Sequence, residues 1–92
     1  MDTSVHIYYD LFMARQKEFE RDEALRTAIH VFQRQGFGAT TTDHLRYAIG
    51  IGRQSFYDAF KGKEEIYLEA LQIYAADRFA IFLEESRQNI YR

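Results

Sequence analysis

The side chains best suited to recognition chemistry lie together in a short segment that follows a glycine: Arg53, Gln54, Ser55 and Tyr57. Arginine and glutamine can pair with the edges of guanine and adenine through two hydrogen bonds each. Serine and tyrosine hydroxyls can reach phosphate oxygens. On a helix whose inner face is occupied by Phe56 and Phe60, these side chains would be exposed. The segment is therefore a candidate for nucleic-acid recognition.

Catalytic and metal-binding chemistry has little support in the sequence. The histidines His6, His30 and His44 are far apart along the chain, so they do not form a cluster in the sequence. The chain has no cysteine, and no glycine-rich phosphate loop follows a strand. We therefore expect no catalytic residue, no metal ion and no cofactor.

Charge is distributed unevenly along the chain. In total, 12 Lys and Arg stand against 14 Asp and Glu, a net charge of −2. Residues 33–63 hold five basic and two acidic residues, whereas residues 64–92 hold three basic and six acidic ones. The basic surplus could face a nucleic acid. Taken alone, it is more typical of a solvated helix surface, so charge leaves both interpretations open.

Three short helices must position the candidate segment. Apolar residues at helical spacing predict a first helix from Glu23 to Gln35, with Asp22 as its N-cap and Gly36 as its left-handed stop. After it, Phe37 should return to the core. Thr41 can cap a second helix over residues 42–49.

The second and third helices have the pattern of a helix-turn-helix. Gly50 breaks the second helix, Ile51 should plug the turn, and Gly52 can cap a third helix from Arg53 to Phe60. The predicted core of the three helices consists of Leu25, Ile29, Phe32, Leu45, Ile51 and Phe56. Eight residues make a rod about 12 Å long, which matches the width of a DNA major groove.

Residues 64–92 contain neither glycine nor proline, and we expect one long helix or two with a slight kink. The apolar residues of this segment surround the helix axis instead of forming one stripe, which indicates burial on several sides. Three short helices cannot cover it. We therefore expect contact with a partner subunit or with missing chain, carried by Leu71, Phe79 and Phe82.

The fold class that follows is all-α. We expect residues 1–18 to be a leader or flexible arm, residues 19–63 a helix-turn-helix DNA-binding domain, and residues 64–92 a linking or dimerisation helix. No uncharged run is long enough to span a bilayer, and the absence of cysteine fits a reducing compartment. A cytoplasmic location without a membrane partner is expected.

Several stretches resemble the N-terminal DNA-binding domain of TetR-family transcriptional regulators, over residues 19–74. Their spacings are preserved independently of one another, which makes the resemblance specific. The matching stretches are Ala24-Leu25-x-x-Ala28 leading to Phe32, Gly36-Phe37-Gly38-Ala39-Thr40-Thr41, Leu45-x-x-Ala48-Ile49-Gly50-Ile51, and Ser55-Phe56-Tyr57-x-x-Phe60-x-x-Lys63-Glu64.

The resemblance implies a sequence-specific regulator that binds double-stranded DNA. Thr41, Tyr57 and Lys63 match positions that contact backbone phosphates, Thr41 through its hydroxyl and amide. Arg53, Gln54 and Ser55 match groove-facing positions, and Thr42 and Lys61 complete the candidate DNA-binding set. The resemblance also implies a homodimer on a palindromic operator and repression relieved by a small-molecule effector. By the same resemblance, residues 64–92 start an effector domain that is otherwise missing here, so the effector would bind only the full-length protein.

The sequence departs from the family pattern where the two helices approach each other. Arg46 stands where a small or apolar residue is usual, which puts the crossing angle in question.

The alternative function is a helical protein–protein interaction module without DNA binding, supported by the apolar residues of 64–92 and the net negative charge. The salt dependence of binding distinguishes these two functions. Phosphate-driven binding weakens steeply as the salt concentration rises, whereas binding through an apolar interface scarcely changes.

Overall fold

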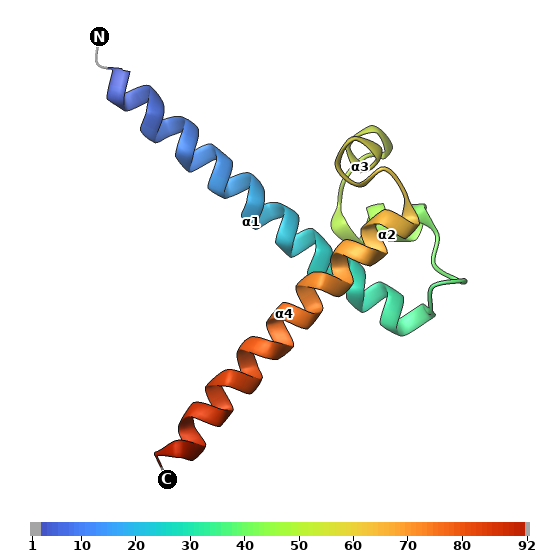
Figure 1. The fold of residues 1–92 in the computed structure, drawn as a ribbon. Helices are drawn as coiled ribbons and strands as arrows, with labels where there is room; N and C mark the ends of the chain where they lie inside the picture. The colour runs from blue at the N-terminus through green and yellow to red at the C-terminus, as the bar shows by residue number, and fades with distance from the viewer. Residues whose placement is uncertain (1–2, 92) are drawn as a thin grey trace.

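The chain folds into four helices, α1 (Thr3–Gln35), α2 (Thr42–Ile49), α3 (Arg53–Phe60) and α4 (Lys63–Ile90). This computed structural model describes residues 3–91, apart from the side chains of residues 3–5 and Phe19. Expectations that concern Met1, Asp2 and Arg92 lie outside the described residues. Residues 3–91 contain no strand, so the all-α prediction is confirmed. Figure 1 shows α1 and α4 as two long rods that cross, with α2 and α3 gathered on one side of the crossing.

The core lies where the C-terminal half of α1 and the first turns of α4 enclose α2 and α3. Its fully buried large side chains are Leu45, Phe56 and Ile66, one from each of α2, α3 and α4. Burial of such a side chain is worth about 1.5–3 kcal/mol. The remaining buried apolar residues are Leu25, Ala28, Ile29, Val31, Phe32, Phe60 and Ala70. All predicted core residues belong to it except Ile51, which is only partly buried and packs against its edge.

The start of α1 differs from the prediction. The helix begins at Thr3 instead of Glu23, and Asp22 lies inside it rather than capping it. An Asp placed before an amphipathic stretch resembles a cap, but residues 3–35 contain no glycine or proline to interrupt the helix. Residues 3–18 are therefore helical in the structure. Their assignment as a leader separate from the domain stays a prediction.

The connection between α1 and α2 depends on a glycine and a buried hydroxyl. Gly36 adopts a φ of 83°, the left-handed conformation that ends many helices. The hydroxyl of Thr40 is buried and donates to the carbonyl of Gly36 at 2.7 Å. Phe37 does not enter the core as predicted and stays 39% exposed. Its ring instead lies over the rings of Phe32 and Tyr67, with centroids 5.9 and 5.0 Å away.

Two arginines of α1 tie it to α4. The guanidinium of Arg26 donates to both carboxylate oxygens of Asp77, at 2.9 and 3.1 Å. Arg21 donates to Glu69 at 2.6 Å and to the carbonyl of Ala59 at 2.8 Å, and so joins α1 to α3 as well. Paired hydrogen bonds of this kind fix direction as well as distance. They help to hold α1 and α4 in the crossed arrangement that Figure 1 shows.

Replacing Asp77 by asparagine should lower the Tm at about pH 7, and the deficit should shrink as the pH falls. The hydrogen bond from Arg26, followed by its charge, holds the pKa of Asp77 below its ordinary value. The ionised form therefore adds stability above the unfolded-state pKa of about 3.9 and loses it as the pH falls through the lower folded value. Thermal unfolding of both proteins from about pH 7 to about pH 3 measures the effect.

Glu84→Gln is the matched control for Asp77→Asn. Glu84 pairs with Arg87 three residues along the same helix, so no second helix depends on this pair. The control should have a smaller effect on Tm than Asp77→Asn. A Tm deficit for Asp77→Asn that is equal at both ends of the pH range would contradict the role given to the Arg26–Asp77 pair.

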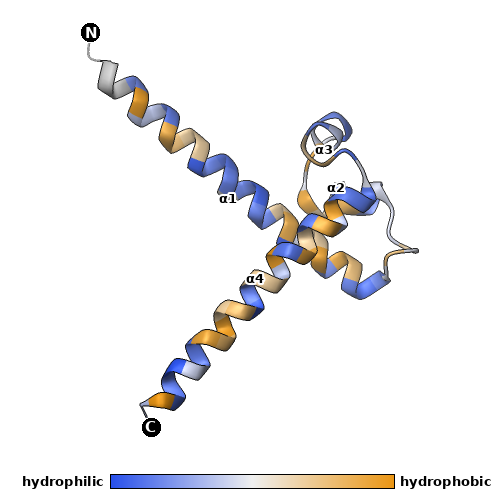
Figure 2. Ribbon diagram, in the orientation of Figure 1, coloured by the Kyte–Doolittle hydropathy of each residue, from blue (hydrophilic) through white to orange (hydrophobic). Residues whose placement is uncertain are grey.

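Beyond the crossing, both long helices project away from the core. α4 is one uninterrupted helix, as predicted, but its distal half is exposed instead of buried on several sides. Figure 2 shows hydrophobic residues alternating with polar ones along both projecting parts. The large exposed apolar residues there include Ile7, Tyr8, Leu11 and Phe12 on α1, and Phe79, Ile81, Phe82 and Leu83 on α4. Among residues 3–91, no helix combines the length and apolarity needed to cross a bilayer.

Candidate nucleic-acid interface

Helices α2 and α3 form a compact unit whose ends are set by local signals. Thr41 caps α2: its hydroxyl accepts from the amide of His44 at 3.1 Å, and its own amide donates to Nδ1 of His44 at 3.3 Å. Gly50 ends α2 with a φ of 88°, and Gly52 begins α3 in an extended conformation without a side-chain cap. The predicted bounds of both helices are confirmed.

The orientation of α3 follows from its two buried phenylalanines. Phe56 and Phe60 are four residues apart and lie inward. Since successive residues turn about 100° around a helix axis, Gln54 and Asp58 lie almost opposite them, at the outermost edge of α3. Arg53 and Tyr57 lie on one flank of this edge and Ser55 on the other. All four predicted recognition residues, Arg53, Gln54, Ser55 and Tyr57, are exposed.

Polar contacts already order the outer surface of α3. The side-chain amide of Gln54 donates from Nε2 to Oδ1 of Asp58 at 2.9 Å. On the flank, Nη2 of Arg53 lies 3.9 Å from Oδ1 of Asp43, which belongs to α2. The amide of Gln54 and the guanidinium of Arg53 are the two groups best suited to base edges, and each therefore has a carboxylate close to it.

Two of the candidate phosphate contacts meet across the helix-turn-helix. The hydroxyls of Thr42 and Tyr57 lie 3.4 Å apart, one from the first turn of α2 and one from α3. Thr41 precedes them, but its amide is occupied by His44, so only its hydroxyl proton is available to a phosphate. These hydroxyls form a cluster of hydrogen-bond donors beside α3.

Lys63 occupies the first position of α4, where a helix N-terminus attracts anions. Its amino group donates to the carbonyl of Phe37 at 2.9 Å and lies 4.3 Å from the centre of the Phe37 ring. The half-exposed Phe37, in the connection between α1 and α2, thus holds the amino group of Lys63 in place. Lys61 is exposed at the end of α3 and has a φ of 68°, which is unusual for a residue other than glycine.

Arg46, which the family pattern would make small, does not separate α2 from α3. Its guanidinium bonds Asp43 at 2.8 Å and lies 4.7 Å from the centre of the Tyr47 ring, so it stays on the surface of α2. The hydrogen bond from Arg46 lowers the pKa of Asp43, with a further contribution from the charge of Arg53. Asp43 is therefore ionised at neutral pH and its charge is balanced by two arginines.

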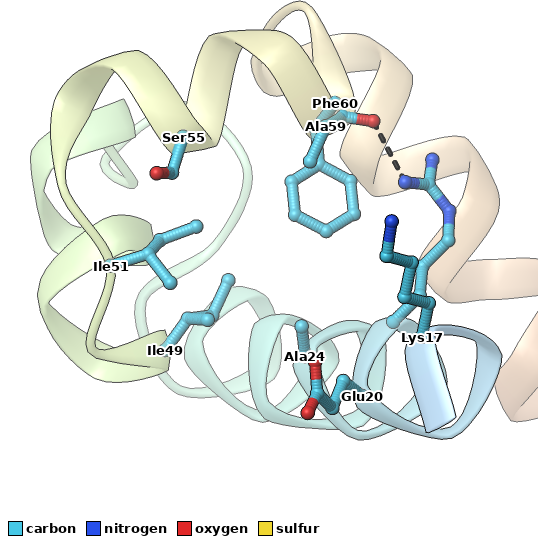
Figure 3. Close-up of a pocket in the computed structure, with 9 residues that line it drawn as sticks. Lys17, Glu20, Ala24, Ile49, Ile51, Ser55, Ala59 and Phe60 are labelled. Atoms are coloured by element: carbon cyan, nitrogen blue, oxygen red, sulfur yellow. Dashed lines mark hydrogen bonds between the residues drawn. The ribbon is translucent and has the colours of Figure 1, made fainter. Parts of the chain in front are cut away.

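A cavity of about 340 Å³ opens between α1 and the α2–α3 turn. Figure 3 shows Ile49 and Ile51 facing Ala24 of α1 across it, with the ring of Phe60 beside them. This opening explains why Ile51 is only partly buried. Ser55 lines the rim of the cavity, away from the Thr42–Tyr57 cluster. Among the described residues, no group of His, Asp and Glu is placed to hold a metal ion.

The sequence interpretation missed three contributors to this surface: His44 as the partner of the Thr41 cap, Asp58 as the partner of Gln54, and Phe37 as the support of Lys63. The first two had a signal, because a residue three or four positions further along a helix lies within reach. The Phe37–Lys63 contact joins residues 26 positions apart and had none.

Comparison with known proteins gives a family and three relatives. The model of the family described as "Bacterial regulatory proteins, tetR family" matches residues 24–70. The uncharacterized HTH-type transcriptional regulator YezE of Bacillus subtilis is 36% identical over 72 residues, 78% of this chain and 37% of that protein. YerO, named in the same way and from the same organism, is 34% identical over 55 residues, 60% of this chain and 19% of YerO.

A third relative, the HTH-type transcriptional repressor ComR of Escherichia coli, is 38% identical over 66 residues, 72% of this chain and 31% of ComR. The chain therefore spans less than two fifths of the length of each of these relatives. No solved structure matches.

Proposed function

The chain belongs to the TetR family of bacterial regulatory proteins, and on that basis we propose that it is the DNA-binding part of a transcriptional regulator and not an enzyme. In this proposal α3 enters the major groove of double-stranded DNA. The observation that carries it is the exposed outer surface of α3, where Arg53, Gln54 and Ser55 project from a helix held by buried Phe56 and Phe60. A helix of this length, about 12 Å, fits the groove.

Phosphate contacts are proposed on either side of α3. The hydroxyls of Thr42 and Tyr57 are close enough to bind a single phosphate group. Thr41 would add its hydroxyl, and Lys61 and Lys63 would add positive charge at the start of α4. Contacts of this kind set the position of the protein on the duplex without reading its sequence.

Assembly and regulation form the finer part of the proposal. We propose a homodimer on a palindromic operator, with Leu71, Phe79 and Phe82 among the contacts between subunits. These side chains are exposed on α4, and the last two lie 6.5 Å apart between ring centres. A repressor role is in line with the name of the E. coli relative. Release by a small-molecule effector would need a domain beyond these residues, and the protein would act in the cytoplasm.

A second candidate function is supported by the many large apolar side chains that the distal half of α4 exposes. A helical protein–protein interaction module would use that surface and leave α3 unoccupied. The two functions differ in their response to salt. DNA binding should weaken with a log–log slope of about −0.9 per phosphate neutralised, whereas apolar association should hardly change.

Lys63→Ala should weaken binding to specific and random duplexes alike and reduce the magnitude of the salt slope by about one. The physical reason is that a phosphate contact adds affinity irrespective of sequence. Fluorescence anisotropy titrations of labelled duplexes over a range of salt concentrations measure both effects.

Arg78→Ala is the matched control, because it removes one positive charge from an exposed site on α4 that is far from α3 along the chain. It should leave the salt slope unchanged. If Lys63→Ala and wild type gave the same affinity and slope on both kinds of duplex, Lys63 would be removed from the interface. If wild type bound no duplex at low salt, the interaction-module function would be favoured instead.

A further inference from the structure

The outermost edge of α3 carries a glutamine and an aspartate that are bonded to each other. Nε2 of Gln54 donates to Oδ1 of Asp58 at 2.9 Å. Both side chains are exposed and lie almost opposite the buried phenylalanines of α3, so they would be the first to meet base edges. Among the described residues, Asp58 has no ion-pair partner, and Gln54 is the donor that its carboxylate uses.

This bond decides which way the amide of Gln54 points. An ionised carboxylate can only accept hydrogen bonds, so Asp58 attracts the NH2 end of the amide and repels its oxygen. A free glutamine could present either end outward. When the Nε2 hydrogen trans to Oε1 is the one bonded to Asp58, the amide keeps Oε1 and its other Nε2 hydrogen available side by side.

This acceptor–donor pair is complementary to the major-groove edge of one base, adenine. In the major groove adenine offers an N6 donor beside an N7 acceptor, and a glutamine amide pairs with both. Guanine offers two acceptors at the same edge, which an acceptor–donor pair cannot satisfy together. We propose that Asp58 is a positioning residue that orients Gln54 to select an A·T pair in each half-site. This inference rests on the proposed DNA-binding function.

The charge of Asp58 gives the proposal a distinctive signature. A carboxylate at the edge of α3 opposes the negative field of DNA and so disfavours every sequence to a similar degree. Removing it should therefore strengthen binding to random duplexes while the preference at one base pair is lost. Removal of a residue that only stabilised the fold would weaken binding to the selected duplex and to random duplexes alike.

The experiment compares wild type with Asp58→Ala, Asp58→Asn and Gln54→Ala by binding-site selection, followed by titrations on the selected duplex, on its single-base variants and on a random duplex. Wild type should prefer A·T at one position of the half-site by about 5- to 150-fold. Asp58→Ala should lose most of that preference, as should Gln54→Ala, and Asp58→Ala should bind the random duplex at least as tightly as wild type. Asp58→Asn keeps an acceptor oxygen and should recover part of the preference.

Glu85→Ala is the control for charge, since it removes one exposed acid from the distal part of α4 and should leave the selected motif unchanged. An unchanged motif for Asp58→Ala, or an equal loss of affinity for all duplexes, would overturn this inference while DNA binding by wild type still supported the proposed function. Selection of a motif with no A·T preference that depends on Gln54 would also overturn it. If wild type bound no duplex, both proposals would fail together.

Discussion

Phe56→Ala is expected to lower the free energy of unfolding by about 3–5 kcal/mol, the range for removing a buried phenylalanine. Phe56 is 0% exposed and is the central side chain between α3 and the rest of the core. Its ring lies 5.7 Å from that of Phe60 and 5.4 Å from that of Tyr57. A chain of 92 residues has a free energy of unfolding of roughly 5–14 kcal/mol, so this loss is a large share of the total.

Urea unfolding monitored by circular dichroism measures this change in the free energy of unfolding. Phe12→Ala is the control, because it removes the same ring from a side chain that is 62% exposed on the projecting part of α1. The control should shift the midpoint much less, since an exposed ring leaves no cavity behind. Equal midpoints for the two variants would mean that α3 does not depend on Phe56, and the packing described for the helix-turn-helix would be wrong.

The second large effect concerns association. Phe79→Glu combined with Phe82→Glu should shift the proposed dimer to monomer and weaken operator binding by about 10²- to 10⁴-fold. The two rings are more than half exposed and adjacent on α4, and burying each one would be worth about 1.5–3 kcal/mol. Two charges on this surface would oppose its burial. A single half-site contact then has to act without the gain from a linked pair.

Sedimentation velocity at matched concentration, together with operator titrations, tests this prediction. The control is Ile7→Glu with Tyr8→Glu, which places the same two charges on the projecting part of α1. The control should remain dimeric if α4 supplies the subunit contact. Thermal unfolding of the double variant should retain the core transition, because neither phenylalanine belongs to the core. A wild-type chain that sediments as a monomer would contradict the proposed use of α4.

The helix-turn-helix shows how far local signals reach. The bounds of α2 and α3 were predictable to the residue, because a threonine cap, a left-handed Gly50 and the extended Gly52 each act within a few residues. The inward placement of Leu45 and Phe56 followed from their spacing. The start of α1 was not predictable, since Asp22 carries the same local signal whether or not helix precedes it.

Exposure was the property that sequence spacing predicted least well. The apolar residues around α4 suggested burial on several sides, yet most side chains of its distal half are exposed. Phe37 shows the converse, because a predicted core residue became the half-exposed support of Lys63. In both cases the outcome depends on where neighbouring helices end, which side-chain type does not specify.

By itself, the sequence determined the helical class, the helix-turn-helix with its bounds, the residues that α3 exposes and the family. These properties depend on periodicity, caps and glycine conformations, which act over a few residues. Only the tertiary structure decided how α1 and α4 cross, with Arg26 bonded to Asp77. It also decided that Lys63 donates to the carbonyl of Phe37. The same is true of the hydroxyls of Thr42 and Tyr57, which lie close together. Each of these contacts joins residues from different segments, and their approach is set by the packing of whole helices around Leu45, Phe56 and Ile66.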